Sequence, residues 1–139
     1  MYTNILFAID LLTEHSHLAE KAAQIAKQFK AKLYLLHVIE LPASVQLAQG
    51  LGFTELASPS KDDAKTILSL VGESLNIPES QQIVEIGSIK DSVIKKAKAL
   101  DCQMIIIGSH SARGIESLFE HNVHSIINNA FCDVITLKA

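Results

Sequence analysis

Five short β-rich runs alternate with longer segments of helical periodicity along this chain. The runs cover residues 4–9, 32–38, 82–86, 104–107 and 134–138. Strands that alternate with helices in this way build βαβ units, in which neighbouring strands are parallel and helices cover the sheet. The alternation therefore predicts an α/β fold of order β-α-β-α-β-α-β-α-β.

Between these runs, apolar residues recur at intervals of three and four, as on the buried face of a helix. The four stripes are Leu18, Ala22, Ile25, Ala26 and Phe29; Ala64, Ile67, Leu68, Val71 and Leu75; Ile89, Val93, Ile94, Ala97 and Leu100; and Val123, Ile126, Ile127 and Ala130. Ser88 followed three residues later by Asp91 resembles a capping box at the start of the third helix. Residues 40–59 sustain no period and predict a long connection.

Length and charge narrow the class of protein. The chain has 139 residues, enough for one domain, residues 1–139, that buries roughly two thirds of its unfolded surface. Its net charge of −3 argues against general attraction to nucleic acid or to an anionic membrane. No apolar run approaches the roughly 20 residues that cross a bilayer, and the first residues lack a basic leader. We therefore expect a cytoplasmic protein that binds neither nucleic acid nor membrane.

The fourth β-rich run ends in a loop suited to an anion. Residues 104–107 are apolar, stop at Gly108 and open into small polar residues that begin with Ser109. A buried parallel strand delivers its carboxyl end to such a loop, and backbone N–H groups there and in the next helical turn can face a phosphate. This segment is the first candidate for a ligand site.

Four short motifs together resemble the universal stress protein family over nearly the whole chain. They are Asn4–Asp10, Leu36–Val38, Gly87–Ile89 and Ile106–His110. The resemblance implies a three-layer α/β/α fold, Rossmann-like and similar to the adenine nucleotide alpha-hydrolases, with a five-stranded parallel sheet of order 3-2-1-4-5 and four helices. Chain direction would then switch between the first and fourth strands, and a crevice would open beyond their carboxyl ends.

In the nucleotide-binding branch of this family, a loop of the form G-x2-G-x9-G-[ST] wraps the phosphates. Counted from Gly108, the second glycine position holds Ser111, the third holds His121 and the last position holds Asn122. Where φ is above zero, a non-glycine residue costs roughly 1–2 kcal/mol, so these replacements weaken a phosphate loop. The degraded loop resembles the universal stress protein A branch, which lacks the glycine motif.

Nucleotide binding stays open as the alternative, because the crevice keeps polar groups. The resemblance implies that Asp10 and the main chain of Val38 would hold adenosine. Serine and asparagine side chains in the loop carry donors, and Arg113 can pair with a phosphate. The candidate nucleotide-binding residues are Asp10, Val38, Gly108, Ser109, Ser111, Arg113, Asn122 and Val123. Their ligand would be ATP or another adenine nucleotide, and no cofactor is required otherwise.

Catalytic and metal-binding motifs are weak in this sequence. It contains no G-x-S-x-G elbow, no P-loop lysine and no carboxylate pair with an obvious division of acid and base roles. His110, His121 and His124 could approach one another, but no acidic or thiolate ligand stands at diagnostic spacing, so no metal site is predicted. His37 is expected to be a partly buried, hydrogen-bonded histidine. The resemblance allows slow ATP hydrolysis or self-phosphorylation, without naming a residue for either.

The last β-rich run predicts self-association. It contains Val134, Ile135, Thr136 and Leu137, lacks proline and would form an edge strand in the family order. The resemblance implies that two such strands pair antiparallel about a twofold axis, so we expect a homodimer.

Both cysteines stand two residues before a β-rich run. If the fourth and fifth strands are parallel neighbours, Cys102 and Cys132 emerge at the same end, near the separation that a disulfide requires. We expect two reduced, packed thiols, with a redox pair as the alternative.

Three functions therefore remain. The leading one is a homodimeric stress-response protein that acts through binding or regulation with a partner that the sequence does not identify. The second is an ATP-binding regulatory module, and the third is a small enzyme of the adenine nucleotide alpha-hydrolase type.

Overall fold

The computed structural model describes residues 1–11, 15–40, 47, 51, 58–109 and 118–138. Its strands are β1 (Asn4–Ala8), β2 (Lys32–Ile39), β3 (Gln82–Ile86), β4 (Met104–Ser109) and β5 (Asp133–Lys138). Its α-helices are α1 (His15–Phe29), α3 (Ser58–Leu75), α4 (Ile89–Ala99) and α5 (Leu118–Asn129), and the 3-10 turn η2 (Glu79–Gln81) precedes β3. Most of the predicted connection at residues 40–59 lies outside the described residues.

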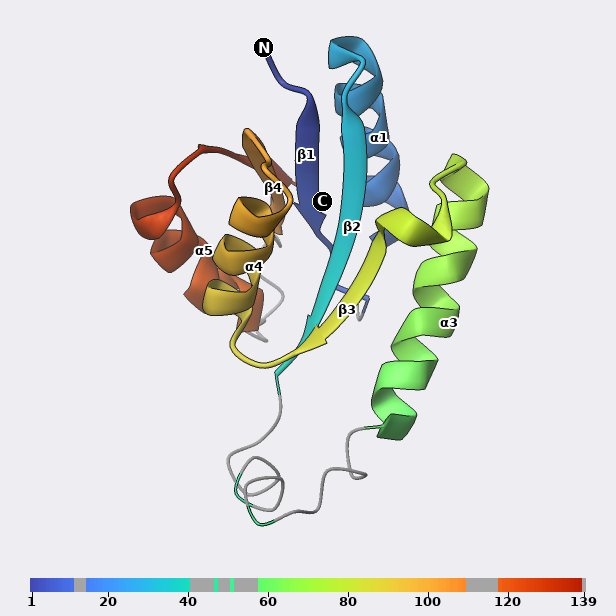
Figure 1. Cartoon of the computed structure of the whole chain (residues 1–139), viewed down its shortest axis with the longest axis vertical. Helices are drawn as coiled ribbons and strands as arrows, with labels where there is room; N and C mark the ends of the chain where they lie inside the picture. The colour runs from blue at the N-terminus through green and yellow to red at the C-terminus, as the bar shows by residue number, and fades with distance from the viewer. Residues whose placement is uncertain (12–14, 41–46, 48–50, 52–57, 110–117, 139) are drawn as a thin grey trace.

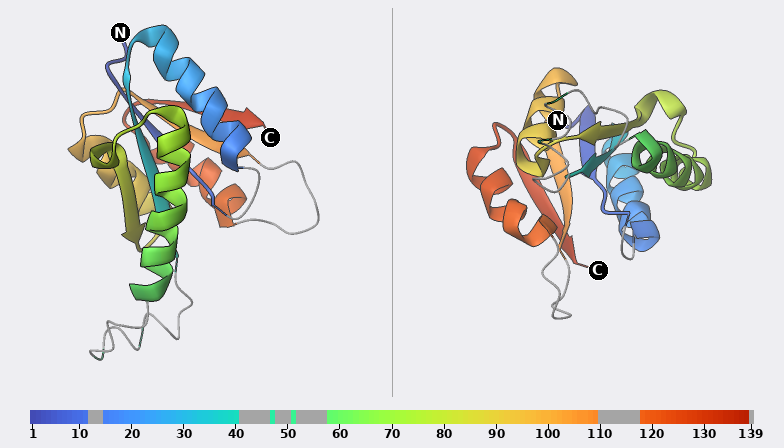
Figure 2. Two further views of the ribbon diagram at one scale, coloured as in Figure 1. Left: turned by 90° about the vertical axis from the view of Figure 1, so that its right-hand side faces the viewer. Right: turned by 90° about the horizontal axis from the view of Figure 1, so that it is seen from below.

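The strands form one parallel sheet of order β3-β2-β1-β4-β5, which confirms the predicted order (Figure 1). β1 is central, because Ala8 pairs with Leu36 of β2 on one side and with Ile107 of β4 on the other. α1 and α3 cover one face of the sheet, and α4 and α5 cover the other (Figure 2). The predicted three-layer α/β/α fold is therefore confirmed.

Alternation along the central strand builds two apolar cores. Ile5, Phe7 and Ile9 lie in the core with α1 and α3, whereas Leu6 and Ala8 lie in the core with α4 and α5. Each of these side chains is at most 1 % exposed. A strand buried on both faces reads as a continuous apolar run, which explains why residues 5–9 carry no polar side chain.

Three side chains that the helical stripes predict as buried are exposed instead: Phe29 at 44 %, Ile67 at 38 % and Ile127 at 46 %. Ile67 and Ile127 lie at the margins of their stripes, outside the arc that the sheet covers. Phe29 is the last residue of α1, and its ring packs edge-on against Tyr2 with the centroids 4.8 Å apart. Periodicity thus gives the direction of a buried helical face but not its width.

The described helices are amphipathic. α4 begins at the predicted cap, where Ser88 Oγ accepts a hydrogen bond from the Asp91 amide at 3.4 Å. Its buried residues are Ile89, Val93 and Ala97. Among the described helices, none combines the length and the apolarity that crossing a membrane would need.

One side chain ties β1 to β4 at the amino edge of the sheet. Gln103 Oε1 accepts hydrogen bonds from the Thr3 amide at 2.8 Å, the Asn4 amide at 2.9 Å and Thr3 Oγ1 at 2.9 Å. Its Nε2 donates to the Asp101 carbonyl at 2.7 Å. These bonds satisfy the amide groups where β1 enters the sheet, and the ligand-site candidates lie at the opposite, carboxyl edge.

Candidate functional site

Three neighbouring strands end together at the carboxyl edge of the sheet. Asp10 follows β1, Val38 lies near the end of β2, and Gly108 and Ser109 close β4. The registers of Ala8 with Leu36 and with Ile107 bring these ends alongside one another. Val38 is buried and Asp10 is half-exposed. The structure thus places four of the candidate nucleotide-binding residues at one edge, at the switch in chain direction that α/β proteins use for ligands.

Gly108 packs closely against a side chain of α1. A β-carbon at this position would lie 2.6 Å from Leu18 Cδ1, which belongs to α1 and is buried. Successive residues of β4 alternate between the two faces, so position 108 faces α1 together with Ile106. Glycine therefore lets α1 approach the end of β4, whether or not a ligand is bound there.

His37 lies beside the end of β1 and makes the hydrogen bond expected of it. Its Nδ1 lies 2.9 Å from the Ile9 carbonyl. A carbonyl only accepts, so Nδ1 is the donor and carries a proton. The bond links β2 to the residue before Asp10, which assigns His37 a positioning role at this edge and confirms the partly buried, hydrogen-bonded interpretation.

Glu40 is a polar residue at this edge that the sequence interpretation did not single out. It follows β2, and its Oε2 accepts a hydrogen bond from the Ile89 amide, the first residue of α4, at 3.3 Å. A carboxylate is favourable at the amino end of a helix, where N–H groups lack partners within the helix. Together with the Ser88 cap, Glu40 provides acceptors for two amides in the first turn of α4. The sequence offered one signal for Glu40, an acidic residue directly after a predicted strand, but its helix partner is 49 residues away along the chain.

The remaining loop candidates are only partly within the described residues. Asn122 and Val123 lie in α5, and both are half-exposed. Ser111 and Arg113 lie outside the described residues, as does His110.

The described residues contain no cluster of side chains that could bind a metal ion. His124 is exposed on α5, and among the described residues no group of three histidine, cysteine or acidic side chains converges.

The two thiols lie in the same apolar core at the other end of β4 and β5. Cys102 is buried and Cys132 is half-buried, and both are free. Burial raises the pKa of the Cys102 thiol to about 12, with smaller contributions from Cys132 and Asp101. Burial and then the charge of Asp133 raise the pKa of Cys132. Both groups are therefore protonated thiols near neutral pH, which makes them weak nucleophiles.

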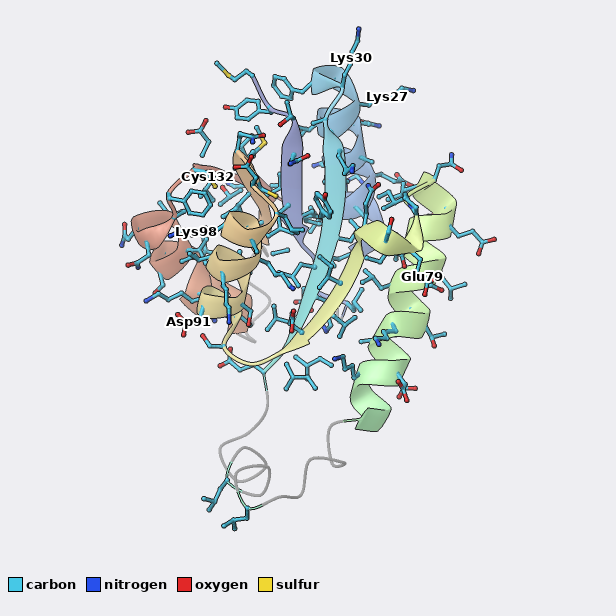
Figure 3. All side chains as sticks on the ribbon, viewed as in Figure 1. Lys27, Lys30, Glu79, Asp91, Lys98 and Cys132 are labelled. Atoms are coloured by element: carbon cyan, nitrogen blue, oxygen red, sulfur yellow. The ribbon has the colours of Figure 1, made fainter. Side chains whose placement is uncertain are left out.

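A cavity of about 760 Å³ lies away from this edge, between the carboxyl ends of α1 and α3. Its floor includes Ala26, Leu33 and Ile77, and its rim includes Lys27 and Lys30, which are labelled in Figure 3. Both helices end at this cavity. The Ala31 amide donates to the Ala26 carbonyl at the end of α1, and the Ile77 amide donates to the Gly72 carbonyl at the end of α3. Lysine beside helix carboxyl ends is the ordinary complement to the helix dipole, so this cavity adds no chemistry to the crevice.

A family model, curated relatives and solved structures all resemble this chain over nearly its whole length. The family model described as the universal stress protein family matches residues 1–138. Universal stress protein A homolog 2 of Coxiella burnetii is 30 % identical, with 99 % of this chain and 95 % of the relative covered. The solved structure of hypothetical protein MJ0577 has a TM-score of 0.75 at 24 % identity, covering 100 % of this chain and 97 % of that one. A universal stress protein solved in complex with cAMP has a TM-score of 0.67 at 13 % identity, covering 99 % and 97 %.

Proposed function

Because this chain belongs to the universal stress protein family, we propose that it is a small homodimeric stress-response protein of the cytoplasm that acts by binding and regulation. In this proposal the protein has no catalytic cycle of its own, and its output is an interaction with a regulatory partner.

The observation that carries this proposal is the contact between Leu18 and Gly108. The glycine that remains from the phosphate-loop pattern also packs against α1, since a β-carbon there would lie 2.6 Å from Leu18 Cδ1, the terminal methyl group of a buried side chain. The two other glycine positions hold Ser111 and His121. These features favour a crevice without strong affinity for ATP.

The alternative is an adenine-nucleotide module with a modified loop. It is supported by the shared edge of Asp10, Val38 and Gly108, and by a structural neighbour in complex with cAMP. In this version Asp10 and the Val38 main chain hold the nucleoside, and loop side chains, including Ser111 and Arg113, replace the missing glycine amides as phosphate donors.

Calorimetric titration separates the two proposals. Purified protein is titrated with ATP-Mg, ADP, AMP and cAMP, and native mass spectrometry examines whether a nucleotide is carried through purification. The leading proposal expects dissociation constants weaker than about 100 μM for all four and no carried nucleotide. Micromolar binding that is lost in Asp10→Asn, with the unfolding midpoint unchanged, would establish the alternative.

The homodimer is proposed to form through β5. This strand is the edge beyond β4, and Thr136 is exposed on it. Antiparallel pairing about a twofold axis would extend the sheet across two copies and cover Val134, Ile135 and Leu137 at the edge.

A further inference from the structure

β3 forms the other edge of the sheet, and the hydrogen-bond register tells which of its backbone groups face outward. The Gly87 amide donates to the Ile39 carbonyl of β2 at 3.0 Å. In a parallel ladder, alternate residues direct both backbone groups to the same neighbour. Residues 83 and 85 therefore face β2, and Gln82, Val84 and Ile86 direct their N–H and C=O groups away from the sheet.

Most of these outward groups are available for a further strand. The Gln82 amide bonds to the Glu79 carbonyl of η2. For Val84 and Ile86, the described residues contain no partner for the outward N–H or C=O groups. Figure 1 looks onto this edge, with α4 on one side of β3, α3 on the other and no helix crossing in front of it. Such a row of free donors and acceptors is a template for strand addition.

Beside this edge runs a small groove with basic side chains. A cavity of about 260 Å³ between β3 and α4 is lined by Glu85, Ile86, Ser92, Lys95, Lys96 and Ala99. Lys96 Nζ lies 2.9 Å from Glu85 Oε1, with both side chains about one third exposed. Lys95 is exposed and has no ion-pair partner within the described residues. Any strand added at β3 would direct every second side chain toward these lysines.

The charge of α4 also argues against a second copy of this chain at the β3 edge. α4 carries Lys90, Lys95, Lys96 and Lys98 against one acidic residue, Asp91. Antiparallel pairing of two β3 edges about a twofold axis would bring two such helices side by side, and like charges would oppose it. A partner segment that carries carboxylates would instead be attracted to the lysines of α4.

We propose that the β3 edge receives an extended acidic peptide segment of a partner protein as a sixth strand. Its main chain pairs with Val84 and Ile86, and its acidic side chains on the α4 side face Lys95 and Lys96. The proposal gives the binding role proposed above a class of partner and rests on that role for its meaning in the cell. The peptide contact itself depends neither on a nucleotide nor on pairing through β5.

The test uses the full chain and a labelled probe, acetyl-Glu-Val-Glu-Val-Glu-Val-amide. Fluorescence anisotropy measures affinity, and amide hydrogen exchange by NMR locates the contact. We expect saturable binding that weakens with salt and slows exchange at Val84 and Ile86, while exchange along β5 is unchanged. The same sequence with lysine in place of glutamate, or with N-methylated valines, binds at least about tenfold more weakly.

Two variants examine the backbone and the charge separately. Ile86→Pro removes an outward N–H but no bond to β2, and is expected to weaken binding by about tenfold while NMR shows the fold intact. Lys95→Glu is expected to weaken binding by about fivefold. Lys98→Glu is the matched control, because Lys98 lies on the side of α4 away from β3 (Figure 3) and its loss should change affinity less than about twofold.

Several outcomes would overturn the proposal. These are equal affinity for the acidic and basic probes, protection along β5 in place of β3, and equal losses from Lys95→Glu and Lys98→Glu. Dimerisation that Ile86→Pro abolishes would assign the edge to a second copy. Nucleotide binding and the mass of the protein in solution are measured in separate experiments. A negative result with the peptide would therefore reject the sixth strand at β3 without rejecting the function proposed above, which the calorimetric titration tests.

Discussion

Leu18 of α1 stands where a side chain on Gly108 of β4 would begin, since Leu18 Cδ1 lies 2.6 Å from the position of a β-carbon at residue 108. The contact joins the first helix to the end of the strand that leads into the candidate loop. Gly108 therefore lies both in the packing contact with α1 and at the edge of the crevice. Mutation of Gly108 and of Leu18 tests the packing contact.

Gly108→Ala is expected to lower the free energy of unfolding by about 1–3 kcal/mol, because its methyl group overpacks against buried Leu18. Leu18→Ala alone costs about 2–5 kcal/mol through the cavity it leaves. In the double variant the new methyl group occupies part of that cavity, so the loss is smaller than the sum. Urea unfolding of the three variants measures this coupling, and strictly additive losses would contradict the packing explanation.

Gln103→Leu is expected to destabilise the protein by about 1–2 kcal/mol, because the Thr3 and Asn4 amides lose their acceptor where β1 enters the sheet. Both amides are near the surface, so water recovers part of the loss. Gln28→Leu, at an exposed position of α1, is the control and should change stability by less than about 0.5 kcal/mol. Equal unfolding midpoints for the two variants would refute the role of Gln103.

Thr136→Pro is expected to convert the proposed dimer to a monomer. The Asp133 amide donates to the carbonyl of Gln103, the residue before β4, so residues 133, 135 and 137 pair inward and the Thr136 N–H faces outward. Proline at this exposed position removes an outward donor and keeps the bonds to β4. Thr136→Val retains the N–H and is the control. Light scattering reports the mass, and a dimer that survives Thr136→Pro would exclude pairing through β5.

The cysteines predict an alkaline loss of stability. Burial raises the pKa of Cys102 to about 12 in the folded protein from an ordinary value near 9, so the thiol releases its proton more readily when the chain unfolds. The stability associated with this shift is complete below pH 9 and is lost as the pH rises toward 12. Urea midpoints of the wild type should therefore fall between pH 8 and pH 10.5 more steeply than those of Cys102→Ala. Parallel curves for the two proteins would contradict the assignment.

The fold could be read from the sequence because it depends on patterns that repeat along whole segments. Continuous apolar runs predicted doubly buried strands, and β3 was predicted at its observed residues, Gln82–Ile86. The Ser88 cap was predicted because its two partners are three residues apart. Side chains at the margins of stripes, such as Ile67 and Ile127, could not be assigned, because their burial depends on how far the sheet extends beneath each helix.

The sequence could predict which strand ends lie together, and the binding roles of the residues there stay predictions. Asp10, Val38 and Gly108 come together because parallel strands end at one edge. Glu40 was missed because its partner, the Ile89 amide, is 49 residues away along the chain. The roles of Ser111, Arg113 and Asn122 toward a nucleotide stay predictions.

By itself, the sequence determined the alternation of strands and helices, the family resemblance and the loss of the phosphate-loop glycines, because each is a local pattern or a count along the chain. Only the tertiary structure decided that Leu18 packs against Gly108, which carboxylate lies at the start of α4 and which backbone groups face outward at the two sheet edges. These depend on distances between residues that are far apart in sequence, such as Leu18 and Gly108, and such distances exist only once the sheet has assembled and the helices have packed on it.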